Sequence, residues 1–102
     1  YDLGSGFGKS VVLAGLLGLN ATGVELVEQR WQGACAALRR ASSGASGLQP
    51  GQVRMVKGDI IQFDFSDADL VFTDSLAFGD DLMEKFNQAA RRMRNGTQII
   101  SA

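Results

Sequence analysis

The stretch Tyr1-Asp2-Leu3-Gly4-Ser5-Gly6-Phe7-Gly8-Lys9-Ser10 decides the fold of this chain. It is typical of the end of a buried strand, a glycine-rich loop and the start of a helix. Its three glycines let the backbone approach a ligand closely, because no Cβ atom stands in the way. The helix that follows presents unpaired N–H groups and the positive end of its dipole. The stretch therefore predicts a ligand-binding loop at the end of a strand.

Two phosphate-binding loops match this stretch only in part. A P-loop has the pattern Gly-x-x-x-x-Gly-Lys-Ser/Thr, and Gly8-Lys9-Ser10 fits its second half, but Leu3 stands where the first glycine belongs. The dinucleotide fingerprint Gly-x-Gly-x-x-Gly fails at its third glycine, where this chain has Lys9. What remains is Asp2-x-Gly4-x-Gly6-x-Gly8, in which an acidic residue ends the strand.

The Asp2 carboxylate favours a cationic ligand over a phosphorylated one. A negative side chain beside the loop repels a pyrophosphate and attracts an ammonium group. S-adenosylmethionine carries an ammonium group, a sulfonium group and no phosphate, so Asp2 can pair with its amino-acid end while the glycines pass beneath. The alternative is that Asp2 only caps the following turn, a position in which Asp is common.

Length and composition narrow the class of protein. The chain has 102 residues and a net charge of −1, which indicates one domain or part of one and no nucleic-acid-binding surface in this stretch. Cys35 is the only cysteine and there is no histidine, so we expect neither a disulfide nor a metal site. No apolar run reaches the roughly twenty residues of a membrane span. Both ends fall on strand-like segments, so we expect a fragment of a longer intracellular protein.

The rest of the chain alternates helical and strand-like segments. Val27, Trp31, Ala34, Cys35 and Leu38 recur at helical spacing, which favours a core role over a chemical one for Trp31 and Cys35. The first predicted helix is apolar nearly all round, as expected of a helix that packs against a sheet and another element. Helices are predicted over residues 9–17, 27–41 and 80–94, and further strands over 21–25, 53–57, 68–73 and 97–101.

Acidic residues stand at the carboxyl ends of four predicted strands, at Asp2, Glu25, Asp59 and Asp74. Ligands of open α/β sheets bind outside these ends. An acid about 20 positions after the glycine loop commonly binds a ribose diol, and Glu25 lies 23 positions after Asp2. Glu28, one turn into the next helix, is its competitor, and an acid at a helix N-terminus is the structural alternative for Glu25.

The other two acids, Asp59 and Asp74, are assigned to the adenine and to the methyl acceptor. Asp59 can accept a hydrogen bond from the exocyclic amine of an adenine, and Ile60 can cover one face of the base. The alternative is a turn Asp beside a core Ile. Asp74 is the candidate residue next to the methyl acceptor.

These motifs resemble the disruptor-of-telomeric-silencing family of non-SET histone-lysine methyltransferases. The resemblance covers essentially the whole chain, and Ala77-Phe78-Gly79 is its more specific part. The motifs are Asp2-Leu3-Gly4-Ser5-Gly6-x-Gly8, Gly23-Val24-Glu25, Gly58-Asp59, Val71-Phe72-x-x-x-x-Ala77-Phe78-Gly79 and Gly96-x-x-Ile99-Ile100-Ser101. The resemblance implies a Rossmann-like α/β fold, a doubly wound parallel sheet of five strands in the order 3-2-1-4-5. Residues 1–102 would then be part of a seven-strand, class I methyltransferase domain.

The resemblance also implies a role for individual residues. It places the methionine end of S-adenosylmethionine against Asp2, Gly4, Ser5, Gly6, Gly8 and Lys9, the ribose at Glu25, and the adenine at Asp59 and Ile60. It places Asp74, Ser75 and Phe78 at the catalytic centre. Three positions depart from the family: Lys9 replaces a Gln, Ile60 replaces an aromatic residue, and Asp74-Ser75 replaces an Asn-Asn pair beside the target lysine.

The activity implied is methyl transfer to a lysine of a core histone in the nucleosome, and hence a nuclear protein. Two other functions stay open. The Asp74-Ser75 departure favours a methyltransferase that acts on a small molecule or a non-histone protein. A cofactor-binding module without activity is the third.

Overall fold

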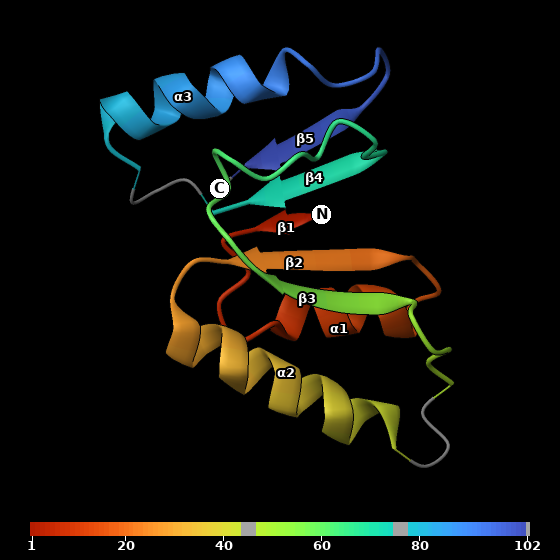
Figure 1. The fold of residues 1–102 in the computed structure, drawn as a ribbon. Coiled ribbons are helices and arrows are strands. Elements are labelled where there is room, and N and C mark those ends of the chain that lie inside the picture. The colour runs from red at the N-terminus through yellow and green to blue at the C-terminus, as the bar shows by residue number, and fades with distance from the viewer. Residues whose placement is uncertain (44–46, 75–77, 102) are drawn as a thin grey trace.

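The elements alternate as the sequence predicts. The computed structural model describes residues 1–43, 47–74 and 78–101 (Figure 1). In chain order its elements are β1 (Asp2–Leu3), α1 (Lys9–Leu16), β2 (Ala21–Glu25), α2 (Glu28–Ser42), β3 (Val53–Lys57), β4 (Leu70–Thr73), α3 (Asp80–Ala90) and β5 (Gln98–Ser101). The predicted strands at 21–25 and 53–57 have the observed bounds, α2 is shifted by one residue, and α1, β4, α3 and β5 are shorter than predicted.

The five strands form one parallel sheet in the order β3-β2-β1-β4-β5, which confirms the predicted topology (Figure 1). β1 lies in the middle, and the chain moves outward from it first through β2 and β3 and later through β4 and β5. The point at which the strand order reverses therefore lies beside β1, where open α/β sheets bind ligands. Because all strands run in the same direction, their carboxyl ends share one edge of the sheet.

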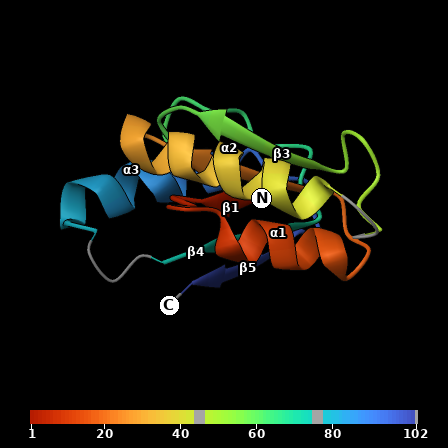
Figure 2. The same ribbon diagram turned by 90° about the horizontal axis from the view of Figure 1, so that it is seen from below.

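Helices and a loop cover the two faces of the sheet. α1 lies so close to β2 that a Cβ atom on Gly23 would come within 2.8 Å of Val11. On the other face, α3 and residues 58–69 pack over the strands, and this core consists of Leu3, Val24, Phe65, Ala68, Val71, Phe86 and Ala89. Figures 1 and 2 show α1 and α2 near β2 and β3, and α3 near β4 and β5.

The burial of two predicted helical faces is only partial. α1 packs against β2, β3 and α2, as expected of a helix that contacts a sheet and another element. Leu13 and Leu16 of α1 and its C-cap Leu17 are nevertheless 55%, 50% and 75% exposed, because the side of the helix with Val11 and Gly15 faces the sheet. Trp31 is only half-buried, and its indole N–H donates a hydrogen bond to the carbonyl of Met55, 3.0 Å away.

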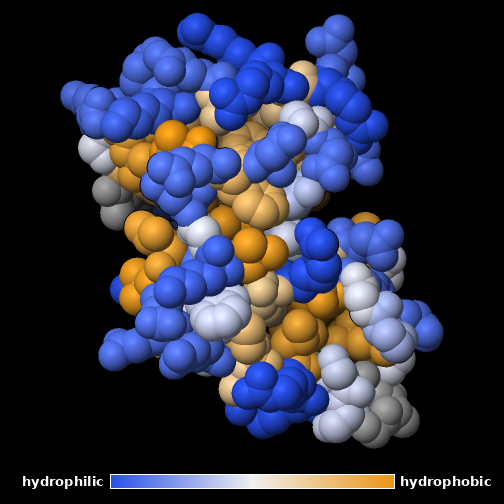
Figure 3. Space-filling model, in the orientation of Figure 1, coloured by the Kyte–Doolittle hydropathy of each residue, from blue (hydrophilic) through white to orange (hydrophobic). Residues whose placement is uncertain are grey.

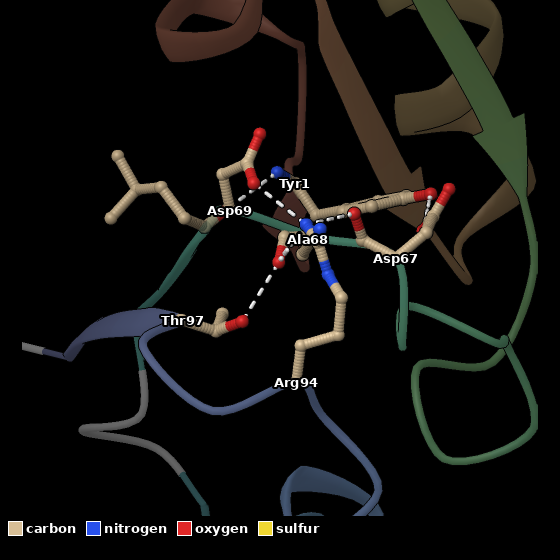
Figure 4. A network of polar contacts seen from close by, with 7 residues as sticks. Tyr1, Asp67, Ala68, Asp69, Arg94 and Thr97 are labelled. Carbon is tan, nitrogen blue, oxygen red and sulfur yellow. Dashed lines mark hydrogen bonds and ion pairs between the residues drawn. The ribbon is translucent and has the colours of Figure 1, made fainter.

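α3 ends at Ala90, four residues before the predicted end, and the chain turns toward β5. Arg94 in this turn does not stabilise the end of the helix but reaches back to the segment before β4. Its guanidinium donates hydrogen bonds to the carbonyls of Asp67 and Ala68 and forms an ion pair of 2.6 Å with Asp69 (Figure 4). The contact lies at the amino end of β4, away from the edge where the acids gather.

Candidate cofactor-binding site

A cleft of about 440 Å³ opens at the carboxyl edge of the sheet. It brings together four residues that the sequence predicts for one ligand: Gly4, Glu25, Asp59 and Ile60. The remaining lining residues are Leu26, Ile61, Gln62, Asp81, Leu82 and Lys85. Figure 3 shows hydrophobic surface in the notch between α3 and the rest of the molecule. The predicted ribose and adenine contacts therefore share one cavity with the first glycine of the loop.

The first two turns of α3 form a wall of this cleft that sequence reasoning missed. Asp81 and Lys85 line it and form an i,i+4 ion pair of 3.4 Å, and Leu82 adds an apolar surface. By its helical spacing with Phe86 and Ala89, Leu82 is expected in the core, and charged residues on an amphipathic helix normally indicate solvent. Only the packing of α3 against the sheet places them at the cleft.

A second hollow, of about 640 Å³, lies at the opposite edge of the sheet. Its lining combines the end of α1 with residues 47–52 and contains no charged side chain. None of the predicted site residues reaches it. The smaller cleft, which is lined by acids and by the glycine loop, is therefore the candidate ligand site.

Four amides of the glycine loop are already hydrogen-bonded within the protein. The N–H groups of Gly4 and Ser5 donate to the carbonyl of Val24 at 2.8 and 3.0 Å, and that of Gly8 donates to Ser5 at 3.0 Å. The N–H of Gly6 donates to the Glu25 carboxylate at 2.7 Å. Loops that cradle phosphate need such N–H groups for the anion. This loop is therefore poorly suited to a phosphorylated ligand.

The three glycines of the loop serve different purposes. All have positive φ, at 80°, 58° and 80° for Gly4, Gly6 and Gly8, a region that disfavours other residues. A Cβ atom on Gly4 or Gly6 would meet nothing within 4 Å, whereas one on Gly8 would lie 2.5 Å from the Cε of Met55. Gly4 and Gly6 thus leave space where a ligand can approach, and Gly8 allows the loop to pack on β3.

Glu25 is buried at the end of β2, with 5% of its surface exposed. Its Oε1 accepts the N–H of Gly6, and its Oε2 accepts the N–H of Val27 at 2.9 Å. Its competitor Glu28 forms an exposed ion pair of 3.4 Å with Lys57 and does not line the cleft. The geometry thus favours Glu25 over Glu28 for a ligand contact. The bond from Glu25 to Val27 also matches the structural alternative, in which Glu25 is an acid at the start of a helix.

Asp2 is half-buried in β1, one residue before the strand ends, and its carboxylate is repelled by that of Glu25. Burial and the Glu25 charge raise the pKa of Asp2 to about 6, against the opposing positive charge of the chain's amino group. In the described part of the chain, no hydrogen bond reaches the Asp2 side chain, so the turn-capping alternative gains no support. A cation beside Asp2 would relieve both the desolvation and the repulsion.

Asp59 and Ile60 fit both interpretations that the sequence left open. The Asp59 carboxylate accepts the N–H of Ile61 at 2.9 Å, as a turn Asp does. Ile60 is half-buried and packs against the core. Both residues nevertheless line the cleft, so their contact with an adenine stays a prediction.

Two of the three predicted catalytic residues, Asp74 and Phe78, lie in the described part of the chain. Asp74 is exposed and directly follows the strand, and Ser75 lies outside the described residues. Phe78 is half-buried, and its ring lies edge-on to Phe86 with 6.3 Å between the centroids. Lys9 is exposed at the first turn of α1. Their roles in a reaction stay predictions.

The residues that the structure describes contain no group of three or more His, Cys, Asp or Glu side chains that could hold a metal ion. None of their helices combines the length and apolar character of a membrane span.

Comparison with known proteins places the fold among methyltransferases. The sequence profile of the family described as "Histone methylation protein DOT1" matches residues 1–102. An RNA methyltransferase from Salinibacter ruber, crystallised with S-adenosyl-L-homocysteine, is 26% identical with a TM-score of 0.80, over 99% of this chain and 61% of that one. No match to this chain was found among curated proteins.

Two less similar structures have the same fold. The glycopeptide N-methyltransferase MtfA, in complex with sinefungin, is 18% identical with a TM-score of 0.79, over 98% of this chain and 44% of that one. A putative S-adenosyl-L-methionine-dependent methyltransferase from Methanococcus maripaludis is 21% identical with a TM-score of 0.74, over 99% and 46%. The chain thus spans between 44% and 61% of the length of these three proteins.

Proposed function

Because this chain belongs to the DOT1 histone methylation family, we propose that it forms the S-adenosylmethionine-binding part of a histone-lysine methyltransferase. The full-length protein would transfer a methyl group to a lysine of a core histone in the nucleosome, and would act in the nucleus. Residues 1–102 would be part of its catalytic domain. The observation that carries the cofactor assignment is a glycine loop whose amides are engaged and whose neighbours are carboxylates.

The charges of the site fit S-adenosylmethionine better than a nucleotide phosphate. The Asp2 carboxylate would pair with the ammonium group of the methionine end, and this end would lie along Gly4, Ser5, Gly6, Gly8 and Lys9. Glu25 would accept hydrogen bonds from the ribose hydroxyls, while Asp59 and Ile60 would contact the adenine. The RNA methyltransferase from Salinibacter ruber was crystallised with S-adenosyl-L-homocysteine, which has the same adenosine and amino-acid groups.

The bound cofactor supplies a methyl group on a positively charged sulfur, and the protein has to bring a neutral amine in line with it. A lysine with a pKa of ~10.4 must first lose its proton, which costs roughly 4–5 kcal/mol at pH 7. Apolar surroundings near Phe78 would favour the neutral amine. Holding the two reactants in line would be the main task of the enzyme.

A second function is favoured by one residue. Asp74 stands where the resemblance predicts an Asn, and a full negative charge beside the acceptor favours the ammonium form of a lysine. This supports an acceptor other than histone lysine, either a small molecule or a non-histone protein. Enzymes with this fold methylate different classes of acceptor, since the similar structures include an RNA methyltransferase and a glycopeptide N-methyltransferase.

Two measurements on the full-length protein test the proposal. Calorimetric titration should give binding of S-adenosylmethionine and none of ATP or NAD; binding of either phosphorylated ligand in the cleft would overturn the cofactor assignment. Transfer of a radioactive methyl group should label intact nucleosomes. Labelling of small molecules alone would refute the histone assignment and support the second function.

A further inference from the structure

Glu25 joins two parts of the cofactor site that are far apart in the sequence. Its Oε1 lies 2.7 Å from the amide of Gly6 in the glycine loop, and its Oε2 lies 2.9 Å from the amide of Val27, the N-cap of α2. The side chain is 5% exposed, and a buried carboxylate needs such partners. Hydrogen bonds between an ionised carboxylate and backbone amides are roughly twice as strong as neutral ones.

Gly6 depends on this contact more than its neighbours do. Gly4 and Ser5 are fastened to the carbonyl of Val24. Gly6 lies in the left-handed region, with φ at 58°, and a Cβ atom there would have no neighbour within 4 Å. Little side-chain packing therefore surrounds this part of the loop. In the described part of the chain, the carboxylate of Glu25 is the hydrogen-bond acceptor of the Gly6 amide.

We propose that Glu25 is a positioning residue, which holds the glycine loop in its binding shape before any ligand arrives, in addition to its contact with the ribose. The loop supports the methionine end of the cofactor, so one side chain governs the affinity for both the methionine end and the ribose of the ligand. The identity of the ligand in this second role rests on the proposed function. The effect of Glu25 on the shape of the loop does not depend on that function.

Amide hydrogen exchange on the ligand-free, full-length protein tests the effect on the loop. Glu25→Ala removes both acceptors, and the Gly6 amide should exchange about tenfold faster or more, the effect of losing one charge-assisted hydrogen bond. The Gly4 and Ser5 amides should keep their rates because Val24 still accepts them. Glu25→Gln, which replaces the carboxylate by a neutral and weaker acceptor of nearly the same volume, should also speed exchange at Gly6 and serves as the test if the alanine variant does not fold.

Glu28→Gln is the matched control, since it removes the same charge from an exposed position one turn away. It should leave the exchange at Gly6 unchanged. The proposal is overturned if neither Glu25 variant raises the Gly6 exchange rate above the change seen at Gly4.

A ligand comparison separates the two roles of Glu25. S-adenosylhomocysteine and its 2′,3′-dideoxy analogue differ only in the ribose hydroxyls. If Glu25 acts through the hydroxyls alone, the analogue binds the wild type and Glu25→Gln equally well, which overturns the proposal. If Glu25 also holds the loop, Glu25→Gln binds the analogue about tenfold more weakly. Failure of the wild type to bind S-adenosylhomocysteine would refute the proposed function, and the exchange experiment alone would then decide the role in the loop.

Discussion

Asp2 and Glu25 are neighbouring carboxylates with different surroundings. Glu25 is the more buried, and two backbone amides compensate its charge. Asp2 is half-buried, and its pKa rises to about 6 through burial and the charge of Glu25. Residues that bind ligands are often destabilising in the free protein. The difference suits Glu25 to shaping the site and Asp2 to attracting the ligand.

Asp2→Asn should stabilise the ligand-free protein by about 1 kcal/mol at pH 7, because it removes a charge that is poorly solvated and repelled. The same change should weaken the stabilisation by S-adenosylmethionine, because the partner of its ammonium group is lost. Thermal unfolding with and without the cofactor measures both effects. A variant that is less stable without ligand yet stabilised by it as strongly as the wild type would contradict the role of Asp2.

Cofactor affinity and stability should depend on pH in opposite directions around Asp2. The folded pKa of about 6 lies above the ordinary 3.8, so the folded state binds more protons between these values, and this contribution to stability decreases as pH rises to about 6. Affinity for S-adenosylmethionine should increase over the same range as Asp2 ionises. Calorimetric titration at pH 5 and pH 7 should give about tenfold weaker binding at pH 5. Asp2→Asn should lose this dependence.

At the scale of elements, two connections determine the shape of the molecule. The loop between β1 and α1 is fastened to the end of β2 by three amides, those of Gly4, Ser5 and Gly6. The turn between α3 and β5 is fastened to the amino end of β4 by Arg94. The first connection shapes the ligand site, and the second supports the opposite edge of the sheet.

Gly6→Val should abolish binding of S-adenosylmethionine, because the new side chain fills the open space above the loop and strains a backbone with positive φ. Gly51→Val is the matched control: Gly51 has a φ of 79° and open space around it, but lies in a turn before β3. Both variants should lose a similar 1–2 kcal/mol or so of stability. Only the first should lose binding in a calorimetric titration, and equal affinities would show that the loop is not the site.

Arg94→Ala should destabilise the protein by about 1–2 kcal/mol in urea unfolding, because the Asp67 carbonyl loses the Arg94 donor and the Ala68 carbonyl keeps only the Thr97 hydroxyl. Asp69→Asn removes only the ion pair, in which the Asp69 side chain is 96% exposed, and should cost about 0.5 kcal/mol or less. A larger effect for Asp69→Asn than for Arg94→Ala would show that charge, not the backbone contacts, makes this connection. Neither variant should alter cofactor affinity.

For the whole molecule, the cleft forms where two layers meet. The end of β2 and the turn at Asp59 supply one wall, and α3 supplies the other through Asp81, Leu82 and Lys85. The methyl acceptor would have to approach past Asp74 at the neighbouring strand end. Among the described residues, a change in the charge of Asp74 is therefore the most direct test of which acceptor the enzyme uses.

Asp74→Asn in the full-length protein should raise methyl transfer to nucleosomal lysine about tenfold at pH 7, if lysine is the acceptor, because a neutral amide lowers the pKa of the nearby amine by about one unit. Scintillation counting of nucleosomes measures the change. The affinity for S-adenosylmethionine, measured in parallel, should not change. Loss of activity together with unchanged cofactor affinity would favour an acceptor that needs the carboxylate.

The sequence by itself determined the order of the elements, the parallel sheet and the acids at the strand ends. These depend on short-range patterns: strand-like runs, helical spacing, and glycines that allow a tight loop. The choice of a cationic ligand over a phosphorylated one also came from sequence, through Asp2. The family follows from the same motifs, since the DOT1 profile matches the whole chain.

Only the tertiary structure decided which of these groups meet and what they do in the free protein. The bond between Glu25 and Gly6 spans 19 residues, and Arg94 reaches Asp67 across 27. The wall that α3 adds to the cleft and the raised pKa of Asp2 arise in the same way. Such contacts depend on how the helices and loops between the strands pack against the sheet. This packing joins residues that are far apart in the chain, and no repeating sequence pattern predicts which of them will meet.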